Sequence, residues 1–195
     1  MEARQLKTLD DLLRSDGDRV ELINGEIIQR PMARCEHALV QSSLSDEVSP
    51  FKRRDPPGGW WIMPEISVSY GEHQCPTHDL AGWRKERVPL RPSGIMTIIP
   101  DWVCEITSPG HERKDLFHNL LLLQRCKVPW YWVISPEDQS LIAYALHGDA
   151  YRVTFSVERG IDQQPERARI PPFEEIEIDL GYLFGSARGI PGCTS

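Results

Sequence analysis

The stretch MTIIPDWVCEIT, from Met96 to Thr107, constrains the fold more than any other part of the chain. It is mostly apolar, as expected of a strand that is buried on both faces of a sheet. The Ser-Pro-Gly that follows it is typical of a turn, so the strand ends there. A buried central strand therefore carries the carboxylate of Glu105 to its end, at the edge of the sheet.

Helical and strand-like patterns alternate on both sides of this strand. Thr8 can cap a short helix over Leu9–Leu13, and Asn24-Gly25 between alternating apolar residues is the strongest local signal for a β-hairpin. Apolar residues at helical spacing predict two longer helices, at about 33–53 and 111–127. Further strands are expected at 60–70, 77–83, 128–136, 140–146 and 150–158, with a short helix or turn at 178–185. This interleaving predicts an α/β fold whose central sheet has helices on its faces.

Composition is typical of soluble globular proteins. The 195 residues are 40% hydrophobic and 26% charged, which suits one domain with its own core. We expect this domain to cover residues 1–185 and residues 186–195 to form a flexible tail. No apolar run approaches the about 18 residues of a membrane span, and no secretion signal is found, so we expect a cytoplasmic protein. The five cysteines follow no repeating spacing and do not predict disulfide bonds.

The net charge bears on nucleic-acid binding. The chain has 22 Lys and Arg against 29 Asp and Glu, a formal charge of −7, so a DNA-binding surface would have to be a local basic patch. Two short basic clusters exist, FKRR at 51–54 and WRKER at 83–87, and in the second Arg84 and Lys85 are the candidate DNA contacts. Short basic clusters are also common in solvated loops, and that alternative stays open.

Four titratable residues are candidates for a shared site. Asp79 stands near the start of one predicted strand and Glu105 at the end of another, so their carboxylates meet at one rim if the strands are neighbours. Mg²⁺ is usually held in this way, by one or two carboxylates with waters and substrate phosphate. Glu65, at the head of a strand, and His37, on the first long helix, can join them. Each signal alone is weak, because such residues often serve as caps or as ordinary helix residues.

A series of longer motifs runs through the chain. In order, they are ELINGEII, the histidine of CEHALV, GGWWIMPE, HDLAGWRKERVP, PDWVCEITSP, the aspartate of KDLFHN, VPWYWVISPE and EEIEIDLGYLF. Together they resemble the Uma-two family, bacterial proteins of the PD-(D/E)XK nuclease superfamily that look like restriction endonucleases. The motifs extend from about residue 7 to residue 184, nearly the whole chain. The resemblance implies a restriction endonuclease-like core, with a four-stranded mixed sheet flanked by helices.

The resemblance also implies a metal site. In this family the aspartate of the PD motif and the glutamate of the CE motif bind the metal, and Asp79 and Glu105 stand in those positions. Glu65 and His37 stand where the family has a glutamate and a helix histidine near the site. The implied cofactor is Mg²⁺ or Mn²⁺ and the implied substrate is DNA, hydrolysed by a water that the metal activates. His78 replaces the family's proline beside Asp79, and it can be an extra ligand, a base or a tolerated change.

The lysine expected of such a site is missing. In the parent superfamily it lies two residues after the glutamate, where this chain has Thr107, and in the Uma-two group it lies on the following helix, four residues after an aspartate. Here that aspartate is Asp115 and the fourth residue on is Asn119, which is neutral and cannot supply the cation. At about 100° per residue along a helix, neither Lys114 nor Lys127 faces the same spot as Asn119.

Two function hypotheses therefore stay open. The first is a metal-dependent nuclease acting on DNA, with Asn119 in place of the lysine. The second is a catalytically weakened or inactive protein of the same fold that acts as a nucleic-acid-binding or dimeric scaffold. For a homodimer, the aromatic side chains of Trp60, Trp61 and Trp130 are candidates for an exposed interface.

Other chemistries are disfavoured. His73, Cys75 and His78 lie close together in the sequence, but the usual zinc spacings need a second pair of ligands, which the sequence lacks. Cys104 falls inside the buried strand, where a thiol is usually inert. The chain has no glycine-rich phosphate loop and no Gly-x-Ser-x-Gly nucleophile motif.

Overall fold

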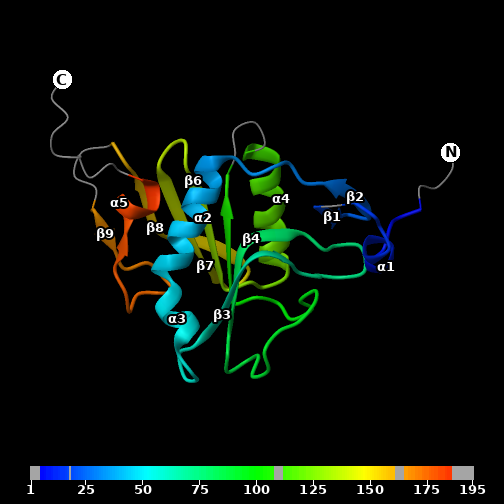
Figure 1. The fold of residues 1–195 in the computed structure, drawn as a ribbon, viewed down its shortest axis with the longest axis horizontal. Helices are drawn as coiled ribbons and strands as arrows, with labels where there is room; N and C mark the ends of the chain where they lie inside the picture. Colours follow the sequence, from blue (N-terminus) through cyan, green and yellow to red (C-terminus); the bar gives the residue numbers. More distant parts are fainter. Residues whose placement is uncertain (1–4, 18, 108–111, 161–164, 186–195) are drawn as a thin grey trace.

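The computed structural model describes residues 5–17, 19–107, 112–160 and 165–185, with side chains for all of these except 112–116. The predicted tail at 186–195 lies outside the described residues. The long strands are β3 (Trp60–Ser67), β4 (Thr77–Arg84), β5 (Trp102–Ile106), β6 (Trp130–Ser135), β7 (Ser140–His147) and β8 (Ala150–Glu158). They form one mixed sheet in that order, in which β5 and β6 are parallel and the other neighbours antiparallel (Figure 1). The α/β fold with a central sheet is confirmed.

The sheet has six strands where the family resemblance implied a four-stranded core. The alternating apolar residues of β7 and β8 form an antiparallel hairpin that extends the sheet beyond β6. β5 is also shorter than predicted, since it begins at Trp102 and not near Met96. Pro100 has no amide hydrogen to donate to a neighbouring strand, and Met96 instead forms an isolated bridge with Val68.

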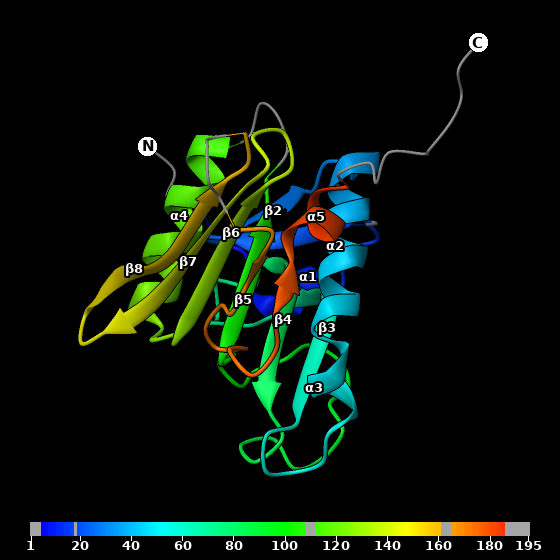
Figure 2. The same cartoon turned by 90° about the vertical axis from the view of Figure 1, so that its left-hand side faces the viewer.

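Helices lie on both faces of the sheet (Figure 2). On one face are α2 (Cys35–Glu47), α3 (Ser49–Arg53) and α5 (Leu180–Phe184), and on the other is α4 (Glu112–Arg125). The single helix expected at 33–53 is wrong, because the chain leaves the helical path at Val48, whose ψ is 2°. Pro50 then stands at the start of α3. The first N–H groups of a helix have no partner within it, so the amide hydrogen that proline lacks costs no helical hydrogen bond.

Aromatic side chains fill the core under α2, α3 and α5. The ring of Phe173 lies 5.0 Å from that of Trp102, 5.2 Å from Trp60 and 5.8 Å from Trp132, measured between centroids. Trp60 is only 2% exposed, so its predicted place in an exposed dimer interface is wrong. The side of β3 that carries Trp60 packs against α3, in the same core as Phe51.

The second core lies between the sheet and α4. Leu123 of α4 is fully buried against Val103 of β5 and Tyr131 of β6, while Trp61 and Trp130 are half-buried. β5 and β6 are therefore covered on both faces, as the apolar sequence of the central strand predicted. This covering fixes the backbone of the strand that carries Glu105.

The N-terminal helix and hairpin are present as predicted. α1 (Leu9–Leu13) begins with a capping box between Thr8 and Asp11. β1 (Val20–Ile23) and β2 (Glu26–Gln29) meet at Asn24 and Gly25, which have φ of 50° and 76°, as a tight hairpin turn requires. Two hydrogen bonds between the backbones of Leu22 and Cys75 hold this hairpin beside the start of β4. Near the C-terminus β9 (Arg167–Ala168) pairs with β10 (Ile178–Asp179).

Phe173→Ala tests the aromatic core. Removing a buried ring that contacts Phe51 and three tryptophans should lower the free energy of unfolding by about 3–5 kcal/mol. Phe117→Ala is the matched control, since Phe117 is 68% exposed on α4 and its removal should change stability by less than about 0.5 kcal/mol. Urea unfolding measures both, and a loss below about 1 kcal/mol in Phe173→Ala would contradict the core described here.

Candidate functional site

The pairing of β4 with β5 brings Asp79 and Glu105 together. Leu80 lies opposite Cys104 in this antiparallel pair, so the next residues along, Asp79 and Glu105, also lie opposite each other. Asp79 is 4% exposed, and its Oδ2 accepts a hydrogen bond of 2.7 Å from the backbone N–H of Ile106. The two carboxylates predicted from the sequence are therefore neighbours at one end of the sheet.

Glu65 approaches Asp79 from the other side. It lies inside β3, not at the head of a strand, between Pro64 and Ile66, which pair with Leu80 and His78. This register places Glu65 across from Asp79. Its φ of 48° is uncommon for a non-glycine residue within a strand and costs about 1–3 kcal/mol, so the surrounding contacts must hold it.

His37 completes a cluster that could hold a metal ion. Its Nε2 atom lies 3.3 Å from Oδ1 of Asp79, and it comes from the first turn of α2. One ligand atom from each of His37, Glu65 and Asp79 lies within 4.8 Å of the others. Burial alone would lower the pKa of His37, but its contact with Asp79 outweighs this and raises it.

His78 holds Glu105 from the interior. It is fully buried, with Nδ1 2.5 Å from Oε1 of Glu105 and Nε2 2.8 Å from the hydroxyl of Tyr70. Burial lowers the pKa of His78 to about 4 and raises that of Tyr70, so both are neutral at pH 7. The two ring nitrogens of His78 are therefore both engaged, Nε2 with the hydroxyl of Tyr70 and Nδ1 with the carboxyl group of Glu105. Of the roles left open for His78, this geometry favours orienting Glu105 over binding a metal directly.

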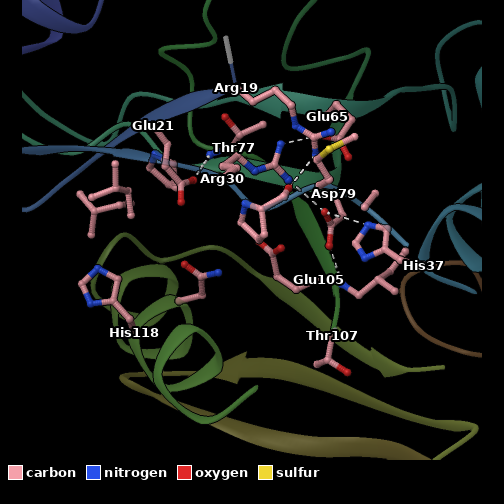
Figure 3. Close-up of a pocket in the computed structure, with 18 of the residues that line it drawn as sticks. Arg19, Glu21, Arg30, His37, Glu65, Thr77, Asp79, Glu105, Thr107 and His118 are labelled. Atoms are coloured by element: carbon pink, nitrogen blue, oxygen red, sulfur yellow. Dashed lines mark hydrogen bonds and ion pairs between the residues drawn. The ribbon is translucent and has the colours of Figure 1, made fainter. Parts of the chain in front are cut away.

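The cluster opens into a cavity of about 460 Å³ (Figure 3). Glu105, Asp79, Glu65 and His37 line one wall, and Asn119 of α4 lines the same cavity. The remaining walls come from the N-terminal hairpin, the end of β5 and α4, and include Arg19, Glu21, Arg30, Thr107 and His118. The structure thus brings the five residues predicted for the catalytic and metal site to one cavity, while Arg84 and Lys85 do not line it. The side chain of Asp115 lies outside the described residues.

Arg30 is a site residue that the sequence reasoning missed. It follows β2 directly, and its guanidinium contacts the carboxylates of Glu65 and Asp79 (Figure 3). The sequence offers a weak signal for it, since it stands at the open end of the predicted hairpin. The bridge from β1 to Cys75, which brings Arg30 over Asp79, cannot be read from local patterns.

The two candidate DNA contacts lie in different surroundings. Lys85 is 9% exposed, and its ammonium donates to the backbone carbonyls of Lys52 and Arg54, at 3.1 and 2.6 Å. It therefore joins the loop after α3 to β4 and does not present its charge at the surface. Arg84 is exposed, with its guanidinium 4.7 Å from the ring of Trp60. Of these two residues, Arg84 is the one placed to contact DNA, and that contact stays a prediction.

The zinc interpretation gains no support from the described residues. The groups of potential metal ligands among them do not include His73, Cys75 and His78 together. Cys75 is buried beside Leu22 of the hairpin, while the ring of His73 contacts the carbonyl of Lys7. In the described part of the chain, no helix is long and apolar enough to span a membrane.

Comparison with known proteins places the chain in a family. Residues 5–181 match the model of Uma2, which is described as "Putative restriction endonuclease". The chain belongs to the Uma2 family. A solved structure from Anabaena variabilis ATCC 29413, titled as a putative nuclease belonging to DUF820, resembles this Uma2 protein with a TM-score of 0.72 and 24% identity. The match covers 91% of this chain and 97% of that one, and it supports the fold. A search of curated proteins gave no match.

Glu105→Gln tests the electrostatics of the site. Burial, with the charge of Asp79, raises the pKa of Glu105 well above its usual value. Folding raises the pKa of this carboxyl, so above pH 4.3, about the pKa of an unfolded glutamate, the folded state binds more protons than the unfolded state. The stability of the folded state therefore falls as the pH rises through this range. Glu105→Gln should therefore stabilise the metal-free protein, and more so at pH 8 than at pH 5.

Urea unfolding with a chelator at the two pH values measures this effect. Glu174→Gln, on an exposed side chain, is the control and should change little at either pH. A Glu105→Gln variant that is less stable than the parent at pH 8 would contradict the assigned direction of the pKa shift.

Proposed function

We propose that this Uma2 protein is a metal-dependent nuclease that hydrolyses phosphodiester bonds in DNA. The observation that carries the proposal is the convergence of His37, Glu65 and Asp79 beside Glu105 in one cavity. Membership of a family described as restriction endonuclease-like supports it. So does the size of the cavity, about 460 Å³, which admits a phosphate group with a metal and its waters.

The donor set fits a divalent ion of the predicted kind. Two carboxylates suit Mg²⁺ and Mn²⁺, and the imidazole nitrogen of His37 favours Mn²⁺ between the two. When bound, such an ion lowers the pKa of a coordinated water and stabilises negative charge on a phosphate. Asp79 and Glu65 would hold it, with His37 as a third ligand and Glu105 next to Asp79.

The protein keeps these ligands in place with its own hydrogen bonds. The Ile106 N–H fixes one oxygen of Asp79, and the Gln41 amide donates to Glu65 at 3.1 Å and to the carbonyl of Asp79 at 2.8 Å. His78 and Tyr70 fix Glu105 from behind. Ligands held in this way need little rearrangement to accept an ion, which is how such contacts raise metal affinity.

Asp79→Asn tests the proposed activity. The wild-type protein should nick a supercoiled plasmid in Mn²⁺ and, less efficiently, in Mg²⁺, and the chelated protein should not. Asp79→Asn keeps the shape of the residue but removes its charge, so nicking should fall below detection and Mn²⁺ affinity should drop about 10–100-fold. Asp149→Asn, on a side chain that is 94% exposed at the β7–β8 turn, should behave like the parent.

Asn119 favours a second candidate function. It lines the cavity without a charge, which fits a nuclease-fold protein that binds DNA or a metal but cuts slowly or not at all. Trp60 is buried and is therefore not available to the homodimeric form of this scaffold hypothesis. The two functions differ in one measurable way, which is whether a restored lysine raises the cleavage rate.

Asn119→Lys separates the two candidates. If the rest of the site is competent, a new cation in the cavity should raise the rate of metal-dependent nicking by about 10–100-fold, by stabilising charge on the phosphate. Gln124→Lys, on the same helix but absent from the cavity wall, is the control for an unspecific gain in DNA affinity. An absence of nicking in both the parent and Asn119→Lys, with DNA still bound, would favour the scaffold.

A further inference from the structure

Arg30 places a positive charge directly on the candidate metal ligands. Its Nη1 contacts the carboxylate of Glu65, and its Nη2 lies 3.3 Å from Oδ1 of Asp79. The side chain is only 15% exposed. In Figure 3 the dashed lines join Arg30 to Glu65 and to Asp79, so the guanidinium bridges two of the three residues of the metal cluster.

The hairpin fixes the position of this charge. The backbone N–H of Arg30 donates to the carbonyl of Arg19, which continues the β1–β2 pairing by one step. The carboxylate of Glu21, on β1, accepts from the N–H of Thr77 at the start of β4. Together with the bridge at Cys75, the bond from Thr77 anchors β1 beside the start of β4, and the pairing within the hairpin then holds Arg30 over Asp79.

The arginine balances the charge of the site before any metal binds. Asp79 is buried, and an uncompensated buried carboxylate is strongly destabilising. Burial alone would lower the pKa of Arg30, but the hydrogen bond and charge of Glu65 outweigh it, so the guanidinium remains charged. Burial alone would raise the pKa of Glu65, but the hydrogen bond and charge of Arg30 outweigh it and lower that pKa.

A divalent ion and Arg30 compete for the carboxylates of Glu65 and Asp79. An ion bonded to both carboxylates would lie within about 5 Å of a guanidinium that still contacted them, and like charges repel at that distance. Metal binding therefore weakens the contacts between the guanidinium and these carboxylates. The hairpin keeps it on the cavity wall, in the space that Asn119 also lines, where it faces any phosphate bound there.

We propose that Arg30 takes the part of the missing helix lysine: it neutralises Glu65 and Asp79 in the metal-free protein, and it binds the DNA phosphate once the metal has displaced it. The cation of this site then comes from the N-terminal hairpin, not from α4. Guanidinium groups suit the task, because they remain charged and bind phosphate through two parallel hydrogen bonds. The phosphate-binding part of the proposal rests on the proposed function.

The displacement is tested by calorimetric titration of Mn²⁺ without DNA. Arg30→Gln should bind Mn²⁺ at least about tenfold more tightly than the parent, because the competing charge is gone. Arg30→Lys, which keeps the charge, should remain within about threefold of the parent. Arg19→Gln is the matched control, since Arg19 lines the same cavity but donates to the carbonyl of Pro31, and it should leave the affinity unchanged.

Equal or weaker Mn²⁺ binding by Arg30→Gln would overturn the displacement. If Arg30→Gln alone does not fold, the double variant Glu65→Gln with Arg30→Gln retains the local charge balance. It is compared with Glu65→Gln, and the same tightening of Mn²⁺ binding is expected.

The phosphate contact is tested by fluorescence anisotropy with a labelled DNA duplex in saturating Ca²⁺, an ion of the same charge and oxygen preference. Arg30→Gln should weaken binding and reduce the slope of log affinity against log salt by about 0.9, the value for one phosphate contact. Arg152→Gln, an exposed change on β8, should leave the slope unchanged. An unchanged slope in Arg30→Gln, or no DNA binding by the parent, would overturn this role.

These readouts are independent of cleavage. If the parent protein binds Mn²⁺ and DNA but does not nick the plasmid, the proposed nuclease activity fails. The two binding experiments still decide the role of Arg30 in that case.

Discussion

The buried carboxylate of Asp79 is the constraint on which the site depends. A charge with 4% exposure must be compensated, and three separate elements contribute to this. The N–H of Ile106 on β5, the ring of His37 on α2 and the guanidinium of Arg30 after β2 all reach its oxygens. The docking of the hairpin and the placement of α2 are therefore tied to the same few atoms, and a metal ion would enter a site that is already electrostatically balanced.

The two cores explain how the carboxylates of the site are held in fixed positions. Phe173 and three tryptophans fill the space under α2 and α3, and Leu123 with Tyr131 fills the space under α4, so β5 is held on both faces. Glu105 stands at the end of this strand and is also held by His78. A rigid strand with a carboxylate fixed from behind suits metal chemistry, because the ligand does not have to be reordered when an ion binds.

Local sequence patterns predicted most of the elements well, and four of the residues that they singled out, His37, Glu65, Asp79 and Glu105, line one cavity. Asn24-Gly25, the cap at Thr8 and the apolar strand before Glu105 depend on contacts between near neighbours, which a sequence displays directly. The misplaced and missed basic side chains depend on contacts between distant residues. Lys85 is 31 positions from the carbonyl of Arg54 that it binds, and Arg30 is 49 positions from Asp79. No local pattern shows that one basic side chain is buried and the other lies in the site.

A crystal structure grown with Mn²⁺ tests the central claim most directly, since anomalous scattering identifies the ion without reference to activity. The account predicts a Mn²⁺ peak bonded to Asp79 together with His37 or Glu65, and a guanidinium of Arg30 that has left Asp79 for the cavity. A structure at saturating Mn²⁺ in which no ion is bound there and Arg30 still contacts both carboxylates would contradict it.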